Sequence, residues 1–124
     1  MTTFDIEKLS HADVMAVEGG LMAMSEHVAP EAGLALVRAA KAITLAQRGR
    51  LTGEQGPHLA CIDLPDWQGA MAHDLDNILI GVETHAGRGL GRGSEEAGFW
   101  LALADVLRAE LGRKRRLVCE TFSL

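Results

Sequence analysis

The chain has 124 residues, 48% of them hydrophobic and 4% aromatic, with a formal net charge of −5 at pH 7. This apolar content excludes an intrinsically disordered chain, and the length fits a single domain covering residues 1–124. The acidic balance disfavours nonspecific attraction to nucleic acid and to anionic membranes.

The first helix is predicted to begin after Ser10, whose hydroxyl can cap it, with Asp13 in its first turn. Apolar residues spaced by three and four then form one stripe, made of Val14, Val17, Leu21, Met24 and Val28. Met15 and Met22 are predicted to widen this stripe. The pair Gly19-Gly20 costs about 1 kcal/mol per glycine relative to alanine, which permits a bend there.

The second helix is predicted to carry Pro30 in its first turn, where the missing N–H of proline costs nothing. Apolar residues lie on two of its sides, so burial on more than one face is expected. One side carries Leu34, Val37 and Leu45, together with Lys41. The other side carries Leu36, Ala40 and Ile43. A polar connection from Gly49 to Pro57 follows. Residues 58–64 suit either a short strand or an extended loop, and we favour the loop.

The third helix is predicted to be capped by Asp66 and to bury one stripe, made of Trp67, Met71, Leu75, Ile78 and Val82. This pattern ends by Gly87, and a glycine-rich turn is predicted from Gly87 to Gly93.

The fourth helix is predicted to be capped by Ser94, with Glu95 and Glu96 at the positive end of its dipole. Its buried stripe is predicted to consist of Trp100, Leu103, Leu107 and Leu111, with Phe99 and Val106 beside it. The basic run Arg113–Arg116 is expected to close the helix, since cations are favourable at a helix C-terminus. The tail, residues 117–124, suits a short strand or a loose end.

Four amphipathic segments with short connections predict an all-α fold, a compact four-helix bundle-like single domain. Short extended segments are expected near 58–64 and at the C-terminus. Cys61 and Cys119 are predicted to be free thiols in a cytoplasmic protein, because the start of the chain lacks the features of a secretion signal. No uncharged apolar run has the length of a membrane span.

The run Ala72–Leu79 contains His73, followed by Asp74 and, three residues further on, Asn77 and an apolar residue. It resembles the H-box of two-component histidine kinases, which lies on a helix of a dimeric bundle. The resemblance implies that His73 accepts a phosphoryl group and that Asp74 orients the ring or takes its proton. The chain has no room for an ATP-binding kinase domain. The resemblance therefore implies a phosphotransfer module that receives its phosphoryl group from another protein.

A metal site is a further hypothesis, because His58 and Cys61 are spaced as H-x-x-C and Asp63 follows. His85 or Cys119 would complete the ligand set. Zinc sites usually show two close pairs of ligands, and only one such pair is present. No metal or other cofactor is therefore predicted.

Five arginines are candidate binding residues. Arg88 and Arg92 lie in the Gly87–Gly93 segment, where backbone amides and a helix N-terminus can hold an anion. Arg113, Arg115 and Arg116 form a cationic patch suited to an acidic partner. Direct binding of nucleic acid is not expected, since no aromatic residues interleave with this patch.

The chain shows no catalytic motif, which favours a non-enzymatic protein that binds another macromolecule. Such a protein would act as an adaptor, inhibitor or regulatory subunit, including in complexes that handle nucleic acid. Methionine-bearing helix faces adapt to partner surfaces, and four methionines are predicted on the first and third helices, namely Met15, Met22, Met24 and Met71. A protein partner or a homodimer is expected. A phosphotransfer module using His73 and a small-ligand or metal-binding module are the alternatives.

Overall fold

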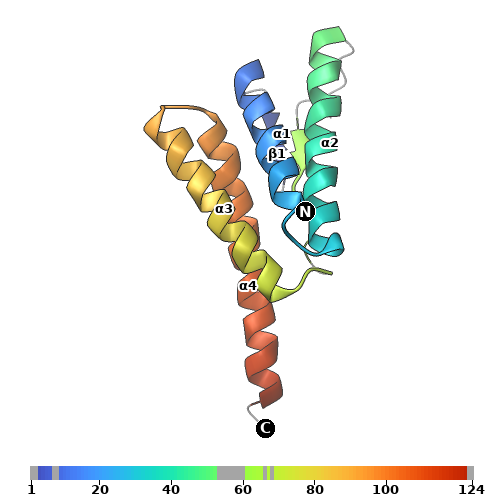
Figure 1. Ribbon diagram of the computed structural model, residues 1–124, viewed down its shortest axis with the longest axis vertical. Helices are drawn as coiled ribbons and strands as arrows, with labels where there is room; N and C mark the ends of the chain where they lie inside the picture. The colour runs from blue at the N-terminus through green and yellow to red at the C-terminus, as the bar shows by residue number, and fades with distance from the viewer. Residues whose placement is uncertain (1–2, 7–8, 53–60, 66, 68, 123–124) are drawn as a thin grey trace.

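The computed structural model describes residues 3–6, 9–52, 61–65, 67 and 69–122. Along the chain lie β1 (Thr3–Asp5), α1 (His11–Ser25), α2 (Pro30–Thr52), β2 (Cys61–Asp63), α3 (Ala72–Gly91) and α4 (Glu96–Phe122). Figure 1 shows two helical hairpins, α1 with α2 and α3 with α4, whose helices lie side by side. The predicted all-α, four-helix bundle-like fold is confirmed.

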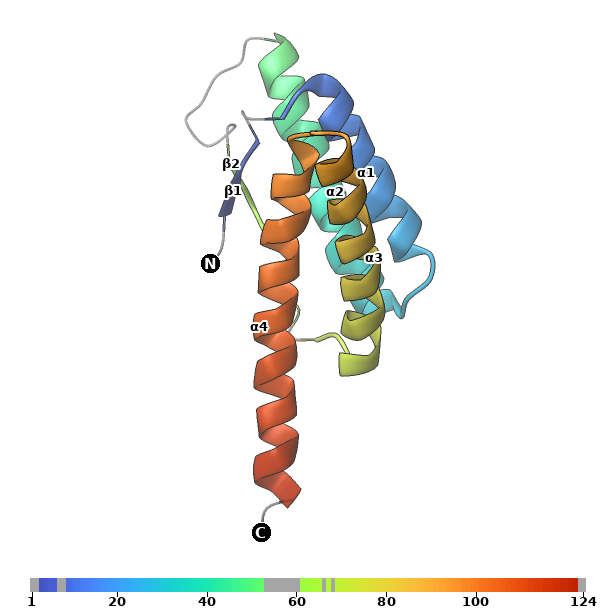
Figure 2. The same cartoon turned by 90° about the vertical axis from the view of Figure 1, so that its left-hand side faces the viewer.

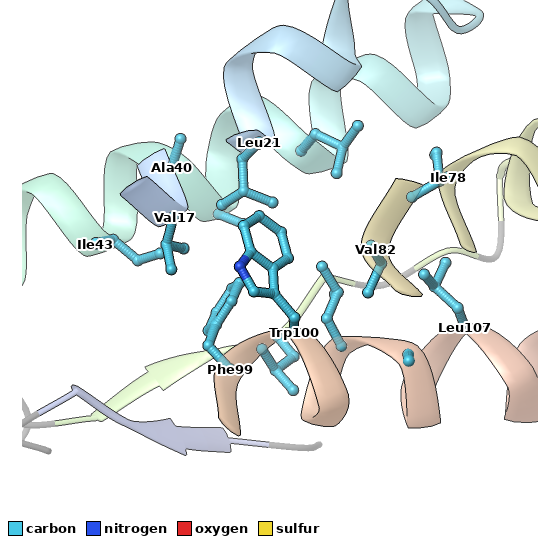
Figure 3. Packing of buried hydrophobic residues seen from close by; sticks show 14 of the residues in the cluster. Val17, Leu21, Ala40, Ile43, Ile78, Val82, Phe99, Trp100 and Leu107 are labelled. Atoms are coloured by element: carbon cyan, nitrogen blue, oxygen red, sulfur yellow. The ribbon is translucent and has the colours of Figure 1, made fainter. Parts of the chain in front are cut away.

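The core lies where the two hairpins face each other. Phe99 and Trp100, near the start of α4, are fully buried and pack edge to face, with ring centroids 5.4 Å apart. Figure 3 shows the side chains around them, which include Val17, Leu21, Ile43, Ile78 and Val82. The predicted fourth-helix stripe is confirmed, since Trp100, Leu103, Leu107 and Leu111 are all buried.

The start of α1 is the predicted one. The hydroxyl of Ser10 accepts a hydrogen bond from the N–H of Asp13 at 3.1 Å, and the Asp13 carboxylate accepts one from the N–H of Ser10 at 3.4 Å. This reciprocal capping box satisfies two of the backbone donors that a helix N-terminus leaves free.

The inward face of α1 also matches the prediction at Val14, Val17 and Leu21, which are buried. The prediction that Met15 and Met22 widen this stripe is wrong, because their side chains are 57% and 45% exposed. Both point away from the core because α2 and the α3–α4 hairpin cover only one side of α1.

Helix α2 begins at Pro30, as predicted. Its buried side carries Leu36, Ala40 and Ile43. Leu34 and Leu45 on the other side are exposed, so the expectation of burial on more than one face is wrong at these two residues.

Strands β1 and β2 form a small antiparallel sheet, which joins the start of the chain to the segment between α2 and α3. Phe4 of β1 lies opposite Ile62 of β2, and the ring of Phe4 packs edge to face on Phe99 with centroids 5.3 Å apart. The prediction of a loop over residues 58–64 is wrong at Cys61–Asp63, which form a strand, and residues 58–60 lie outside the described residues. Strand β1 is not predicted, because three residues are too few to show the alternation typical of a strand.

Helix α3 begins later than predicted. It starts at Ala72, while Trp67 lies in a turn before it and the predicted cap, Asp66, lies outside the described residues. Trp67 is still buried, and the carbonyl oxygen of Trp67 accepts the N–H of Ala70 at 3.0 Å. Gly69 lowers the helix propensity of this stretch by about 1 kcal/mol relative to alanine, which favours the turn. Met71, predicted to be buried, is exposed.

The glycine-rich turn predicted for Gly87–Gly93 is wrong over most of its length, because α3 continues to Gly91. The helix ends in a Schellman motif: the N–H of Gly93 binds the carbonyl of Leu90 at 3.1 Å, and the N–H of Ser94 binds that of Gly89 at 2.8 Å. Gly93 has φ of 66°, in the left-handed region that favours glycine. A Cβ on Gly89 would lie 3.1 Å from the Cβ of Ala97, so glycine there permits close packing of α3 on α4.

Helix α4 spans 27 residues and is therefore about 40 Å long. Two predictions are wrong here, since Arg113–Arg116 does not close the helix and the tail continues as helix to Phe122. Extending a helix that already exists needs no new nucleation, which accounts for this continuation. Figure 2 shows the C-terminal part of α4 extending beyond α2 and α3. Among the described residues, no helix combines the length and apolar character that a membrane crossing requires.

Candidate functional site

The H-box-like run lies at the start of α3. His73 is exposed, and Nδ2 of Asn77, one turn further on, lies 3.3 Å from its Nε2. Asp74 is half-buried, and Asp76 binds Arg115 of α4 at 3.0 Å. Phosphoryl transfer to His73 stays a prediction.

A pocket of about 270 Å³ lies beside this run, between the end of α1 and α3. Met24, Val28 and Ile78 form its apolar part, and His27 and Asn77 supply its polar groups. Sequence reasoning did not select His27, because nothing in the local pattern indicates that the end of the first helix lies against Asn77.

The proposed metal ligands do not come together in the described part of the chain. His85 points to the core, where its ring stacks on Trp100 with centroids 4.6 Å apart. His58 and the side chains of Cys61 and Cys119 lie outside the described residues. Among the described residues, no three His, Cys, Asp or Glu side chains are grouped so that they could hold a metal ion.

The five candidate arginines lie in two separate places. Arg88 and Arg92 are at the end of α3, and Arg113, Arg115 and Arg116 are in the C-terminal half of α4. Three of the five form ion pairs within the fold: Arg92 with Glu96, Arg113 with Glu110, and Arg115 with Asp76. The single cationic patch proposed for residues 113–116 is therefore largely neutralised by the chain itself.

Polar groups at the turn between α3 and α4 hold this end of the bundle together. The buried carboxylate of Glu96 accepts the indole N–H of Trp100 at 3.2 Å and pairs with Arg92. Ser94 accepts the N–H of Glu96 at 3.3 Å, which supports its predicted role as the cap, and donates its own hydroxyl to Asp13 of α1. This hydrogen bond from Ser94 lowers the pKa of Asp13. The cluster is structural, since its groups satisfy one another.

Stability is expected to depend on pH through His85. Burial lowers the pKa of His85 below its ordinary value of 6.5, the charges of Arg88 and Arg92 lower it further, and Glu96 opposes them in part. The unfolded chain therefore takes up the proton first as the pH falls below 6.5. We expect the free energy of unfolding to decrease from about pH 7.5 to pH 5.5 and the decrease to be smaller in His85→Phe. Urea unfolding of wild type and His85→Phe at both pH values measures this decrease in the free energy of unfolding. An equal decrease in wild type and in the variant would contradict the prediction.

The outward side of α1 is apolar and exposed. We call it the α1 outer face, and it consists of Ala12, Met15, Ala16, Gly19, Met22 and Ala23. None of these six residues is charged. Of the acidic residues of α1, Asp13 takes part in the N-terminal cap and Glu18 is half-buried beside the α1 outer face. A Cβ on Gly19 would meet nothing within 4 Å, so the fold leaves open space there. A helix that is apolar on all sides is typical of a buried element, yet this one is covered on one side only.

Comparisons of this chain with protein-family models, with curated proteins and with solved structures found no match.

Proposed function

We propose that this chain is a non-enzymatic protein that binds another protein through the α1 outer face, as an adaptor, inhibitor or regulatory subunit. The observation that carries the proposal is the exposure of Met15 and Met22 on a helix side without charged residues. Contiguous exposed apolar surface is typical of interaction sites. Methionine supports this role because its flexible, polarisable side chain adapts to the shape of a partner.

Gly19 supports the same proposal. A glycine inside a helix costs about 1 kcal/mol relative to alanine. Nothing within 4 Å of its Cβ position requires glycine at residue 19, in contrast to the neighbouring Gly20. Ala16 and Ala23 lie about one turn before and after Gly19. Together the three small residues leave a shallow surface on which a partner helix can approach the backbone closely.

The charge around the face indicates the kind of partner. Glu18 and Glu26 flank it, and the whole chain carries a net charge of −5. A partner helix with an apolar stripe bordered by lysine or arginine would complement both features.

The experiment is an affinity capture from host lysate with wild type, Met15→Glu and Met22→Glu. We expect a stoichiometric partner with wild type, and an affinity lower by at least about tenfold with each variant, because a carboxylate would be desolvated in an apolar contact. Leu45→Glu is the matched control, since Leu45 of α2 is 61% exposed and Met15 is 57% exposed. Circular dichroism of each variant checks that the fold is retained.

Two results would count against the proposal. Equal capture by wild type and both methionine variants would show that the partner binds elsewhere. A monomeric protein that captures nothing would remove the binding role itself. A concentration-dependent dimer that Met15→Glu dissociates and Leu45→Glu does not would identify a second copy as the occupant of the face.

A further inference from the structure

The pocket of about 270 Å³ between the end of α1 and α3, which we call the α1–α3 pocket, continues the α1 outer face. Ala23 belongs to that face, and His27, about one turn further on, belongs to the pocket lining. Both residues are exposed. A partner that lies along the α1 outer face therefore reaches the pocket. The full lining consists of Met24, His27, Val28, Asn77 and Ile78.

The packing of α1 on α3 builds the pocket. The side chain of Met24 is half-buried, and a Cβ on Gly81 would lie 2.8 Å from its Sδ atom, so glycine at this position lets the thioether lie against α3. Ile78, one turn before Gly81, is buried and adds to the apolar lining. The N–H of His27 donates to the carbonyl oxygen of Met24 at 3.2 Å, which holds His27 beside the pocket.

The size and lining of the pocket indicate a single apolar side chain as its occupant. Pockets for drug-sized ligands have volumes of about 300–1,000 Å³. The volume here, about 270 Å³, is below that range. None of the five lining residues is aspartate, glutamate, lysine or arginine, so the lining offers no fixed charge to a charged ligand. Three of them are apolar, which favours burial of an apolar group.

The charge at the border of the pocket matches the partner proposed for the α1 outer face. Glu26 is exposed and directly precedes His27. Asp74 lies three residues before Asn77 on α3 and is half-buried. The neighbouring Asp76 is paired with Arg115. A partner helix whose apolar stripe is bordered by lysine or arginine complements these carboxylates.

We propose that the α1–α3 pocket receives one large apolar side chain, a leucine or a phenylalanine, from the partner helix that covers the α1 outer face. Apolar anchors that fill pockets dominate the energy of many interfaces. His27 and Asn77 are exposed and would bind polar groups of the partner beside this anchor. The inference rests on the proposed function and adds to it the side chain by which the partner is recognised.

The first test uses the protein alone, with ¹³C-labelled methionine methyl groups, and N-acetyl-leucinamide as the probe. The chain has five methionines, so each assigned methyl signal reports on one place. We expect the Met24 signal to shift and saturate as the probe is added to about 50 mM, since one side chain binds weakly. The Met71 signal should stay in place, because Met71 is 71% exposed and does not line the pocket.

The second test repeats the affinity capture with Asn77→Trp, which adds a bulky side chain to the pocket lining. We expect the affinity for the partner to decrease by at least about fivefold, because the anchor would no longer fit. Ile80→Trp is the matched control. Ile80 lies on the same helix, is 65% exposed and does not line the pocket, so this variant should bind as wild type does. Circular dichroism checks that both variants are folded.

The results separate this inference from the proposed function. Loss of capture by Met15→Glu together with full capture by Asn77→Trp would overturn the inference and leave the proposed function intact. An unchanged Met24 signal, or a parallel and unsaturated drift of all the methionine signals, would also overturn it. Saturable binding of the probe by a protein that captures no partner would overturn both proposals and identify a small apolar molecule as the occupant.

Discussion

Leu107→Asp is expected to abolish the native fold. Leu107 is fully buried, and Figure 3 shows it on the side of α4 that faces Ile78 and Val82 of α3. Removing most of a buried leucine costs about 2–5 kcal/mol. Burying a carboxylate without a partner adds several kcal/mol or forces it to take a proton. Together these costs approach the total stability of a domain, about 5–15 kcal/mol.

The matched control is Leu101→Asp on the same helix, where the leucine is 42% exposed. This change should lower the free energy of unfolding by no more than about 1 kcal/mol, as surface substitutions usually do. Circular dichroism and thermal unfolding of both variants measure the difference. A cooperatively folded Leu107→Asp protein with wild-type helix content would show that α4 does not bury this side.

Gly20→Ala and Gly19→Ala are expected to change stability in opposite directions, although the residues are neighbours. A Cβ on Gly20 would lie 2.8 Å from Cη2 and 2.9 Å from Cζ2 of Trp100, far inside van der Waals contact. The indole cannot shift easily, because it is stacked on His85, packed on Phe99 and hydrogen-bonded to Glu96. We expect Gly20→Ala to destabilise the protein by about 1–3 kcal/mol, the usual cost of overpacking.

Gly19→Ala gains helix propensity without a clash, since its Cβ would meet nothing within 4 Å. We expect it to stabilise the isolated protein by about 0.5–1 kcal/mol. Denaturant unfolding of the two variants and wild type measures both values. Stabilisation by both substitutions would show that α1 does not approach Trp100 as closely as described.

Local patterns determined the helices and much of their inward faces. The start of α1 follows from Ser10 and Asp13, because a capping box needs only residues three apart on one helix. The buried stripe of α4 follows in the same way from the helical period. The helical position of His73 and Asn77 was likewise predicted, since one turn of helix places them together.

Contacts between segments that are distant in the sequence could not be predicted from local patterns. Met15 and Met22 suit a core as well as a surface, and their exposure depends on how far the neighbouring helices cover α1. The ion pair of Arg115 with Asp76, and the turn that buries Trp67, depend on packing that no local pattern records.

The glycines show the same division most clearly. That Gly19 and Gly20 would weaken a helix is predictable from residue type alone, because the helix propensity of glycine is a property of its own backbone. The packing of the helices shows what the residue type does not: Trp100 lies against Gly20, Ala97 lies against Gly89, and Gly19 faces open space. Helix periodicity and capping act over one turn, whereas the surface that a helix buries depends on elements that lie far away in the sequence.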